Sequence, residues 1–352
     1  MTNRERIDCL ASGGMPPAEE LRELLDSYTE EERQYAAQKA RSMTDQYYGK
    51  KIYFRGLIEF TNYCRNNCYY CGIQASNRNI QRYRMEPDTI YECCEWGYRA
   101  GFRTFVLQGG EDSYFTDERV EELVRTIHGR YPDCAITLSI GEKERASYQK
   151  YFDAGADRYL LRHETACPIH YRKLHPDSLH LENRMRCLRD LKEIGYQTGC
   201  GMMVGSPYQT SKELVKDLVF IKEFQPEMVG IGPFIPHHDT RFRDFQAGTL
   251  EDTLFLLSLI RFVQPRVLLP ATTALGTIVP DGREQGILAG ANVVMPNISP
   301  GDLRKNYMLY DNKIGTADDA SESQRRLRES ISAIGYEVVM DRGDYLSESD
   351  AG

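Results

Sequence analysis

The sequence predicts a (β/α)8 TIM barrel, an α/β fold, and three observations support this. From residue 52 onward, short apolar runs alternate with amphipathic segments, and eight repeated βα units imply a closed parallel sheet. The chain has 352 residues, which fits a barrel of about 250 residues with an extension at each end. An open doubly wound sheet is the alternative, but no glycine-rich dinucleotide fingerprint follows the first strand.

The expected elements divide the chain into three parts. Residues 1–50 form an N-terminal helical extension, because Pro16 and Pro17 precede an amphipathic segment at 18–25 and another follows at Glu30–Met43. Residues 51–300 form the barrel. Its expected strands are Arg55–Phe60, Thr104–Leu107, Ala135–Ser139, Arg158–Leu161, Thr198–Val204, Met228–Ile231, Val267–Leu269 and Asn292–Met295. Its clearest expected helices are Asp88–Arg99, Glu118–Arg130, Leu181–Ile194 and Ser211–Glu223.

The third part, residues 301–352, has a short C-terminal helical segment at Asp318–Ile334. It ends in a polar, acidic tail from Asp341 that we expect to be frayed.

Composition excludes several classes of function. The net charge is −8 and no long basic run occurs, which argues against nucleic acid or anionic lipid as a partner. No apolar run of 18 residues and no signal-like N-terminus are present, so we expect a cytoplasmic protein without a membrane span. In a reducing cytoplasm, clustered cysteines among the ten in the chain indicate a metal or a catalytic site.

The strongest motif is a cysteine triplet with the spacing C-x3-C-x2-C, formed by Cys64, Cys68 and Cys71 directly after the first predicted strand. Cubane iron–sulfur clusters usually take four thiolates, so three would leave one iron open to a further ligand. The alternative is a zinc knuckle or unrelated core cysteines. Structural zinc sites need four ligands, and no second pair lies nearby. Cys93 and Cys94 are adjacent in a predicted helix and are expected to be structural.

This triplet, with Tyr70 before its last cysteine, resembles the signature of the radical S-adenosylmethionine (SAM) superfamily. The resemblance implies a 4Fe–4S cluster whose open iron chelates the amino and carboxylate groups of SAM. Reductive cleavage of SAM would then produce a 5′-deoxyadenosyl radical. The protein's part in such chemistry is to position the cofactors and exclude competing reactions.

Several strand ends carry groups that would suit SAM. Gln108-Gly109-Gly110-Glu111 resembles the superfamily's motif for the SAM amine, although an ordinary glycine turn is the alternative. A carboxylate at Glu164 suits ribose hydroxyls, and Ser139 ends the third strand. Arg184 could pair with the SAM carboxylate through its planar fork, or it could be a surface helix residue. The expected SAM-binding residues are Tyr70, Gln108, Gly109, Gly110, Glu111, Ser139, Glu164 and Arg184.

A closer resemblance, from about residue 50 to about 312, is to the HydE family of iron-only (FeFe) hydrogenase maturases. Segments that carry it include residues 55–64, 106–112, 159–166, 229–236 and 270–278. It implies a small cysteine-bound iron carbonyl cyanide complex as substrate, other hydrogenase maturases as partners, and an electron donor such as a ferredoxin or flavodoxin. The expected substrate residues, for which barrel packing is the alternative, are Arg55, Arg162, Thr272, Thr273, Met295 and Tyr307.

One departure and several alternatives remain. The chain has no cysteine after Cys200, so we expect no auxiliary cluster in residues 307–330, where some HydE proteins have one. Methylornithine synthase is a possible alternative, and biotin synthase a weaker one because it needs a second cluster. A non-catalytic metallocluster carrier is an alternative of another class. The run His237-His238-Asp239 resembles a metal cluster, but a polar loop is the expected role.

Overall fold

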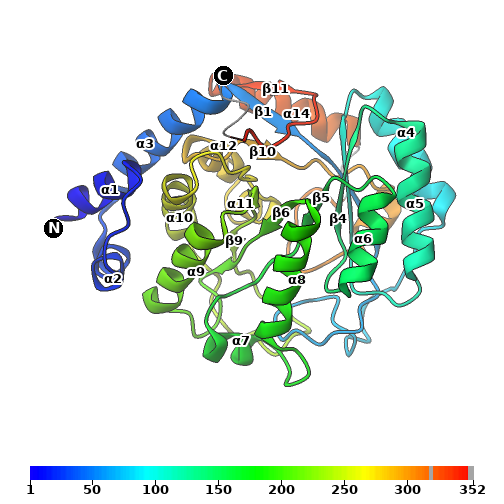
Figure 1. The fold of residues 1–352 in the computed structure, drawn as a ribbon, viewed down its shortest axis with the longest axis horizontal. Helices are drawn as coiled ribbons and strands as arrows, with labels where there is room; N and C mark the ends of the chain where they lie inside the picture. Colours follow the sequence, from blue (N-terminus) through cyan, green and yellow to red (C-terminus); the bar gives the residue numbers. More distant parts are fainter. Residues whose placement is uncertain (317–319, 348–352) are drawn as a thin grey trace.

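The structure, a computed structural model, describes residues 1–316 and 320–347. Within them, a ring of strands is covered on its outside by helices (Figure 1). The strands are β1 (Lys51–Phe54), β2 (Gly56–Thr61), β3 (Thr104–Gly109), β4 (Ala135–Ser139), β5 (Arg158–Leu160), β6 (Gln197–Cys200), β7 (Met203–Val204), β8 (Met228–Val229), β9 (Gly232–Pro233), β10 (Val293–Val294) and β11 (Glu337–Val339).

Most helices lie between successive strands along the chain. The helices are α1 (Asn3–Ala11), α2 (Ala18–Ser27), α3 (Glu30–Tyr48), α4 (Pro87–Arg99), α5 (Asp117–Arg130), α6 (Arg145–Asp153), α7 (Pro168–Leu174), α8 (Leu181–Ile194), α9 (Ser211–Phe224), α10 (Leu250–Val263), α11 (Thr273–Ile278), α12 (Gly282–Leu288), α13 (Gly301–Arg304) and α14 (Ala320–Ala333). The predicted helices are therefore present, except that the start of the one predicted at Asp318 lies outside the described residues.

The ring of parallel strands closes on itself. Six strands pair in the order β2-β3-β4-β5-β6-β8. Met228 of β8 forms a parallel bridge with Leu268, and Pro270, two residues later, forms a parallel bridge with Val293 of β10. Strand β10 then pairs in parallel with β1, which continues into β2. The predicted (β/α)8 barrel is confirmed.

Seven of the eight predicted strands lie at the expected places, although two of these are interrupted, while Val267–Leu269 forms no strand and contributes only an isolated bridge at Leu268. Segment 198–204 forms β6 and β7, and segment 228–231 leads from β8 toward β9. At these interruptions the two backbone segments lie very close together: a Cβ on Gly201 would lie 2.0 Å from the carbonyl oxygen of Gly230. The prediction missed β1, since it began the first strand at Arg55 rather than at Lys51.

The N-terminal helices α1, α2 and α3 pack on the outside of the barrel. A reciprocal capping box between Thr29 and Glu32 starts α3, and its small residues Ala36 and Ala40 are buried next to α10. Almost all of α10 is buried, because it lies between the barrel and the extension. Within the described residues, no helix is long and apolar enough to cross a membrane.

The C-terminal segment closes the base of the barrel, the end where the strands begin. Strand β11 pairs in parallel with β1 (Figure 1). The chain then binds the base: the Arg158 guanidinium donates to the carbonyl of Arg342 at 2.6 Å and pairs with Asp344 at 2.5 Å. The prediction of a frayed tail is therefore wrong for residues 341–347, while residues 348–352 lie outside the described residues. Hydrogen bonds to buried strand residues, which the tail's polar composition does not reveal, account for the difference.

Candidate active site at the carboxyl end of the barrel

The three cysteines of the motif lie on the loop that follows β2, at the carboxyl end of the strands. All three are free and partly buried. The N–H of Cys71 donates to the carbonyl of Cys68 at 3.2 Å, which folds the loop tightly. Arg82 donates to four carbonyls around the loop, including those of Ile73 at 2.8 Å and Gln74 at 2.6 Å. The loop is therefore held in shape by the half-buried guanidinium of Arg82, which is not among the predicted site residues.

The electrostatics of the thiols suit a metal cluster. Burial raises the pKa of Cys64, and burial together with the charge of Cys64 raises the pKa of Cys71 to about 12. Burial and the charge of Cys71 raise the pKa of Cys68 well above its ordinary value. Such neighbouring thiols resist ionisation by themselves, and a bound metal cation offsets both causes. The set fits an iron–sulfur cluster with three protein ligands.

The segment after β3 packs directly against the cysteine loop. A Cβ on Gly110 would lie 2.2 Å from the carbonyl oxygen of Tyr63 and 2.7 Å from the Cβ of Cys64, so a side chain there would displace the loop. Glu111 accepts a hydrogen bond from the N–H of Glu142 at 2.9 Å and pairs with Arg65 at 3.0 Å. The structure thus brings this predicted SAM segment to the cysteines, with one carboxylate held in place beside them.

A second group of predicted residues gathers after β5. Glu164 has a φ of 64°, a strained value for a residue other than glycine, and such strain is concentrated at functional sites. Its carboxylate lies 3.1 Å from Arg162. Arg184 reaches this group from α8, where its Nε donates to Glu142 at 2.5 Å and its Nη1 to the carbonyl of Arg162 at 2.6 Å. Arg184 is buried rather than a surface helix residue.

Strand register places a polar layer inside the barrel near the carboxyl ends of the strands, the part called the upper barrel below. Glu59 on β2 is level with Gln108 on β3, which is level with Ser139 on β4. Gln108 also lies 3.5 Å from the hydroxyl of Tyr307. Two residues predicted to bind SAM and one predicted to bind substrate are therefore close to a carboxylate that the prediction missed. Glu59 was missed because one acidic residue in an apolar strand gave no motif to recognise.

Several buried polar atoms near this layer have no hydrogen-bond partner within the described residues. They are Arg162 Nε and Nη2, Glu164 Oε2, Tyr171 OH and Thr272 Oγ1. Arg162 and Glu164 face each other at 3.1 Å, but without the geometry of a hydrogen bond. Buried polar groups are nearly always satisfied in native proteins, so orphaned atoms here indicate groups that a ligand would pair.

Comparison with known proteins agrees with this geometry. Residues 58–221 match the Radical SAM superfamily. The chain is 50% identical over 268 residues to the [FeFe] hydrogenase maturase subunit HydE of Thermotoga maritima, which covers 76% of each chain. The chain belongs to the radical SAM superfamily. It is a radical SAM enzyme, and its cofactors are a 4Fe–4S cluster and SAM.

Two further matches concern methylornithine synthase. The 3-methylornithine synthase of Methanosarcina acetivorans is 31% identical over 303 residues, 85% of each chain. The crystal structure of methylornithine synthase (PylB) superposes with a TM-score of 0.84 at 26% identity, covering 95% of this chain and 97% of that one. The crystal structure of the maturase HydG has a TM-score of 0.79 at 19% identity, over 96% of this chain and 76% of that one, and shows the fold alone.

The remaining predicted residues of this radical SAM enzyme fall into two places near the mouth. The hydroxyl of Tyr70 lies 3.1 Å from Nε2 of His175, beside the cysteines. Thr273 and Met295 line a small cavity of about 20 Å³ beside α14, and Arg283 donates to the hydroxyl of Thr273 at 3.4 Å. The cavity suits the placement of these two residues next to the upper barrel, but it is too small to hold a substrate.

Arg55 is the one predicted substrate residue that the structure separates from the others. It lies at the base of the barrel, where its guanidinium donates to the carbonyl of Gly343 at 3.2 Å and contacts Met228 Sδ at 3.1 Å. Arg55 precedes β2, whereas the cysteine loop follows it, so the length of the strand lies between them. We therefore withdraw Arg55 from the substrate-binding set.

A polar loop packs on the residues that follow Cys71, since a Cβ on Gly72 would lie 2.3 Å from the ring of His237. His237, His238 and Asp239 approach within 4.8 Å of one another, but His237 Nδ1 accepts from the N–H of Asp239 at 3.1 Å and His238 Nδ1 lies 2.7 Å from Asp311. These bonds fit the expected polar loop.

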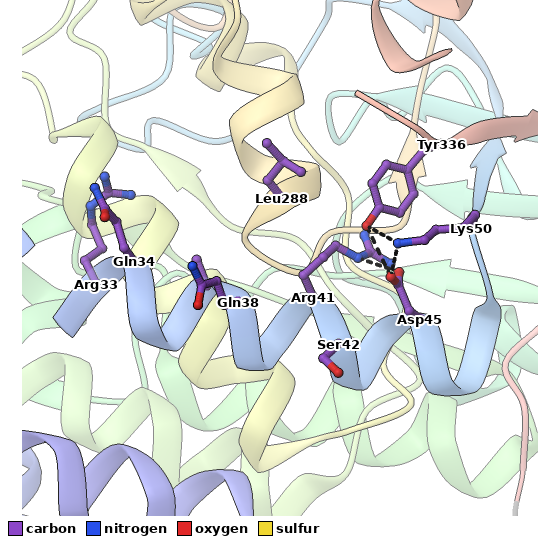
Figure 2. A pocket seen from close by; sticks show the side chains of 10 residues that line it. Arg33, Gln34, Gln38, Arg41, Ser42, Asp45, Lys50, Leu288 and Tyr336 are labelled. Carbon is purple, nitrogen blue, oxygen red and sulfur yellow. Dashed lines mark hydrogen bonds and ion pairs between the residues drawn. The ribbon is translucent and has the colours of Figure 1, made fainter. Parts of the chain in front are cut away.

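A cavity of about 530 Å³ lies outside the barrel on α3 (Figure 2). Its charged groups largely pair with one another, because Asp45 pairs with both Arg41 and Lys50 and accepts from Tyr336, although Arg41 Nη2 has no partner within the described residues. The cavity lies between the N-terminal extension and the base of the barrel, away from the cysteines.

Proposed function

We propose that this radical SAM enzyme matures the two-iron subcluster of FeFe hydrogenase, acting on a small cysteine-bound iron carbonyl cyanide complex. The 50% identity to HydE over 268 residues is the observation that carries the proposal. The polar upper barrel adds support, since an anionic complex needs cations and hydrogen-bond donors. Arg162 and Thr272 offer these with polar atoms that have no partner in the described residues.

The proposed roles follow from position. Cys64, Cys68 and Cys71 would hold the cluster, which when bound supplies the electron that cleaves SAM. The groups proposed to hold and orient SAM beside it are Tyr70, Gln108, Gly109, Gly110, Glu111, Ser139, Glu164 and Arg184. The groups proposed to hold the substrate at the same end of the barrel are Arg162, Thr272, Thr273, Met295 and Tyr307. The mouth of the barrel would exclude water from the radical.

The partners proposed are those of a maturation pathway. Another maturase would deliver the iron complex, a scaffold maturase would receive the product, and a ferredoxin or flavodoxin would supply electrons.

The test has two stages. Reduced, reconstituted protein is incubated with SAM, and we expect 5′-deoxyadenosine and methionine to form. The protein is then added to a hydrogenase maturation extract that lacks HydE, and we expect hydrogenase activity to be restored. SAM cleavage without restored activity would contradict the maturase proposal, and absence of cleavage would contradict radical chemistry altogether.

A second candidate is a methylornithine synthase activity. The match to 3-methylornithine synthase covers 85% of the chain, a larger share than the match to HydE, although at lower identity. Incubation with lysine, SAM and a reductant distinguishes the two. Formation of methylornithine together with failure in the maturation extract would favour this candidate.

A further inference from the structure

We propose that the face beside the cysteine loop is the docking surface for an acidic one-electron carrier protein. The inference rests on the proposed function, because it assumes that the cluster must be reduced, and it adds the place where the donor binds. The surface is called the aromatic–basic patch, and it consists of Ile169, Arg172, Lys173, Tyr208, Arg241 and Arg243.

The centre of the patch is apolar and exposed. Ile169 and Tyr208 keep 62% and 50% of their surface exposed, among the highest values for large hydrophobic residues in the described part of the chain. Ile169, Arg172 and Lys173 share one face of α7, because they are three and four residues apart. The Lys173 ammonium lies 5.1 Å from the centre of the Tyr208 ring, so the helix face and the tyrosine form one surface.

The patch is basic on an otherwise acidic protein. The four segments that surround it, residues 62–80, 168–178, 205–212 and 240–246, contain seven Lys and Arg and two Asp. Arg65 and Arg243 pair with Glu111 and Asp244, and the other five cations leave the surface basic. The whole chain has 44 Lys and Arg against 52 Asp and Glu. A local excess of cations attracts an acidic protein and orients it during the encounter. A small apolar centre with a charged rim suits a short-lived redox contact.

The patch borders the cluster ligands. Tyr69 stands between Cys68 and Cys71, and its N–H donates to the carbonyl of Leu174, the last residue of α7, at 3.0 Å. The Arg241 guanidinium lies 4.6 Å from the centre of the Tyr69 ring. A carrier bound to the patch would thus contact the loop that holds the cluster. One electron leaves the carrier and enters the cluster, and no covalent bond forms or breaks.

The experiment compares two triple charge reversals. The first, Lys173→Glu with Arg241→Glu and Arg243→Glu, reverses the patch. The matched control, Arg99→Glu with Arg125→Glu and Arg325→Glu, reverses three exposed cations on α4, α5 and α14, away from α7 (Figure 1). Flavodoxin is the probe. We measure its dissociation constant by calorimetry and the rate at which its reduced form bleaches the oxidised cluster, at low and at high salt.

At low salt, the dissociation constant of flavodoxin should be at least about tenfold higher for the patch variant than for the wild type, and the rate of cluster reduction at least about tenfold lower. That rate should also depend less on salt in the patch variant. The control variant should behave like the wild type. Reduction by dithionite, which needs no docking, should be the same in all three proteins. Wild-type behaviour of the patch variant, equal losses in both variants, or slow dithionite reduction of the patch variant would each overturn the proposal. SAM cleavage driven by dithionite tests the proposed function separately.

Discussion

The two ends of the barrel contain two arginines whose buried nitrogen atoms are in opposite states. Arg158, at the start of β5, donates to Gln197, to Thr104 and to the carbonyl of Arg342, and it pairs with Asp344. Four residues later, Arg162 has two nitrogen atoms without a hydrogen-bond partner in the described residues. The C-terminal segment thus satisfies Arg158 at the base, where Arg55 Nε and Asn292 Nδ2 lack a partner. At the mouth, Arg162 and Glu164 together keep three buried polar atoms unpaired within the described residues.

The difference indicates a structural role for Arg158, at the start of β5, and a ligand-binding role for Arg162, in the loop that follows the same strand. Unpaired buried groups cost stability, so a fold keeps several of them together only where something else pairs them. The strained backbone of Glu164 lies at the same end. The comparison predicts that substitutions at the mouth change activity and that substitutions at the base change stability.

The largest expected effect is loss of the cluster. Cys68→Ala should abolish both the iron–sulfur absorbance and SAM cleavage, because two thiolates cannot replace three at this site. Absorption spectra after anaerobic reconstitution and assay of 5′-deoxyadenosine give the result. Cys9→Ser on α1, away from the barrel mouth, is the control and should keep both properties. Cleavage that survives in Cys68→Ala would refute the assigned site.

A buried ion pair at the mouth is an exception to this comparison, because we expect its loss to lower stability as a substitution at the base would. Lys313 lies 2.5 Å from Glu59, which also accepts from Asn297 at 2.7 Å, and the side chains are 7% and 1% exposed. Lys313→Met should lower the free energy of unfolding by about 3–5 kcal/mol, because it leaves the Glu59 carboxylate buried without its cation. Urea denaturation measures the loss.

The double variant Lys313→Met with Glu59→Gln is the control for that substitution. It should recover much of the loss, since no unpaired charge then remains. An equally unstable double variant would show that the packing of Lys313, rather than its charge, is responsible.

The fold was largely predictable from local pattern. Alternating apolar runs and amphipathic segments placed the strands and helices, because each element needs one apolar face. The segments that the sequence did not predict correctly depend on contacts with residues far away in the chain. Strand β11 and residues 341–347 are stabilised by β1, Arg158 and Gln197, which lie far away in the chain. No local pattern predicts such contacts for a polar tail.

The site was predictable where a motif had a fixed spacing. The triplet Cys64, Cys68 and Cys71 is an example, and so is the segment around Gly110 that packs against it. Glu59, Arg82 and Glu142 were missed, because single charged residues become recognisable only when register and folding bring them to the site. Arg55 was misplaced because a strand's two ends look alike in composition, although they are at opposite ends of a barrel.

The next prediction compares the two arginines of the opening contrast. Arg158→Met should lower the free energy of unfolding by about 3 kcal/mol, since it removes four contacts, two of which hold the 342–344 segment. Arg162→Met should change stability by less than about 1 kcal/mol, because its guanidinium makes only one partly exposed ion pair. Restoration of hydrogenase activity should instead fall strongly with Arg162→Met. Equal stability losses in the two variants would break the contrast.

The smallest expected effect is the pH dependence of the base. Burial alone would raise the pKa of Asp344, but the Arg158 and Arg342 guanidinium groups hold it at about 2. A carboxyl with a lowered folded-state pKa contributes stability above its unfolded pKa of about 3.9, and loses it as the pH falls through the folded value. Because Asp344 is 38% exposed, solvent screening should limit this contribution to less than about 1 kcal/mol. Asp344→Asn should therefore flatten the stability curve between pH 4 and pH 2, measured by denaturant titration at each pH. Parallel curves for the wild type and the variant would show that Arg158 binds the tail mainly through the Arg342 carbonyl.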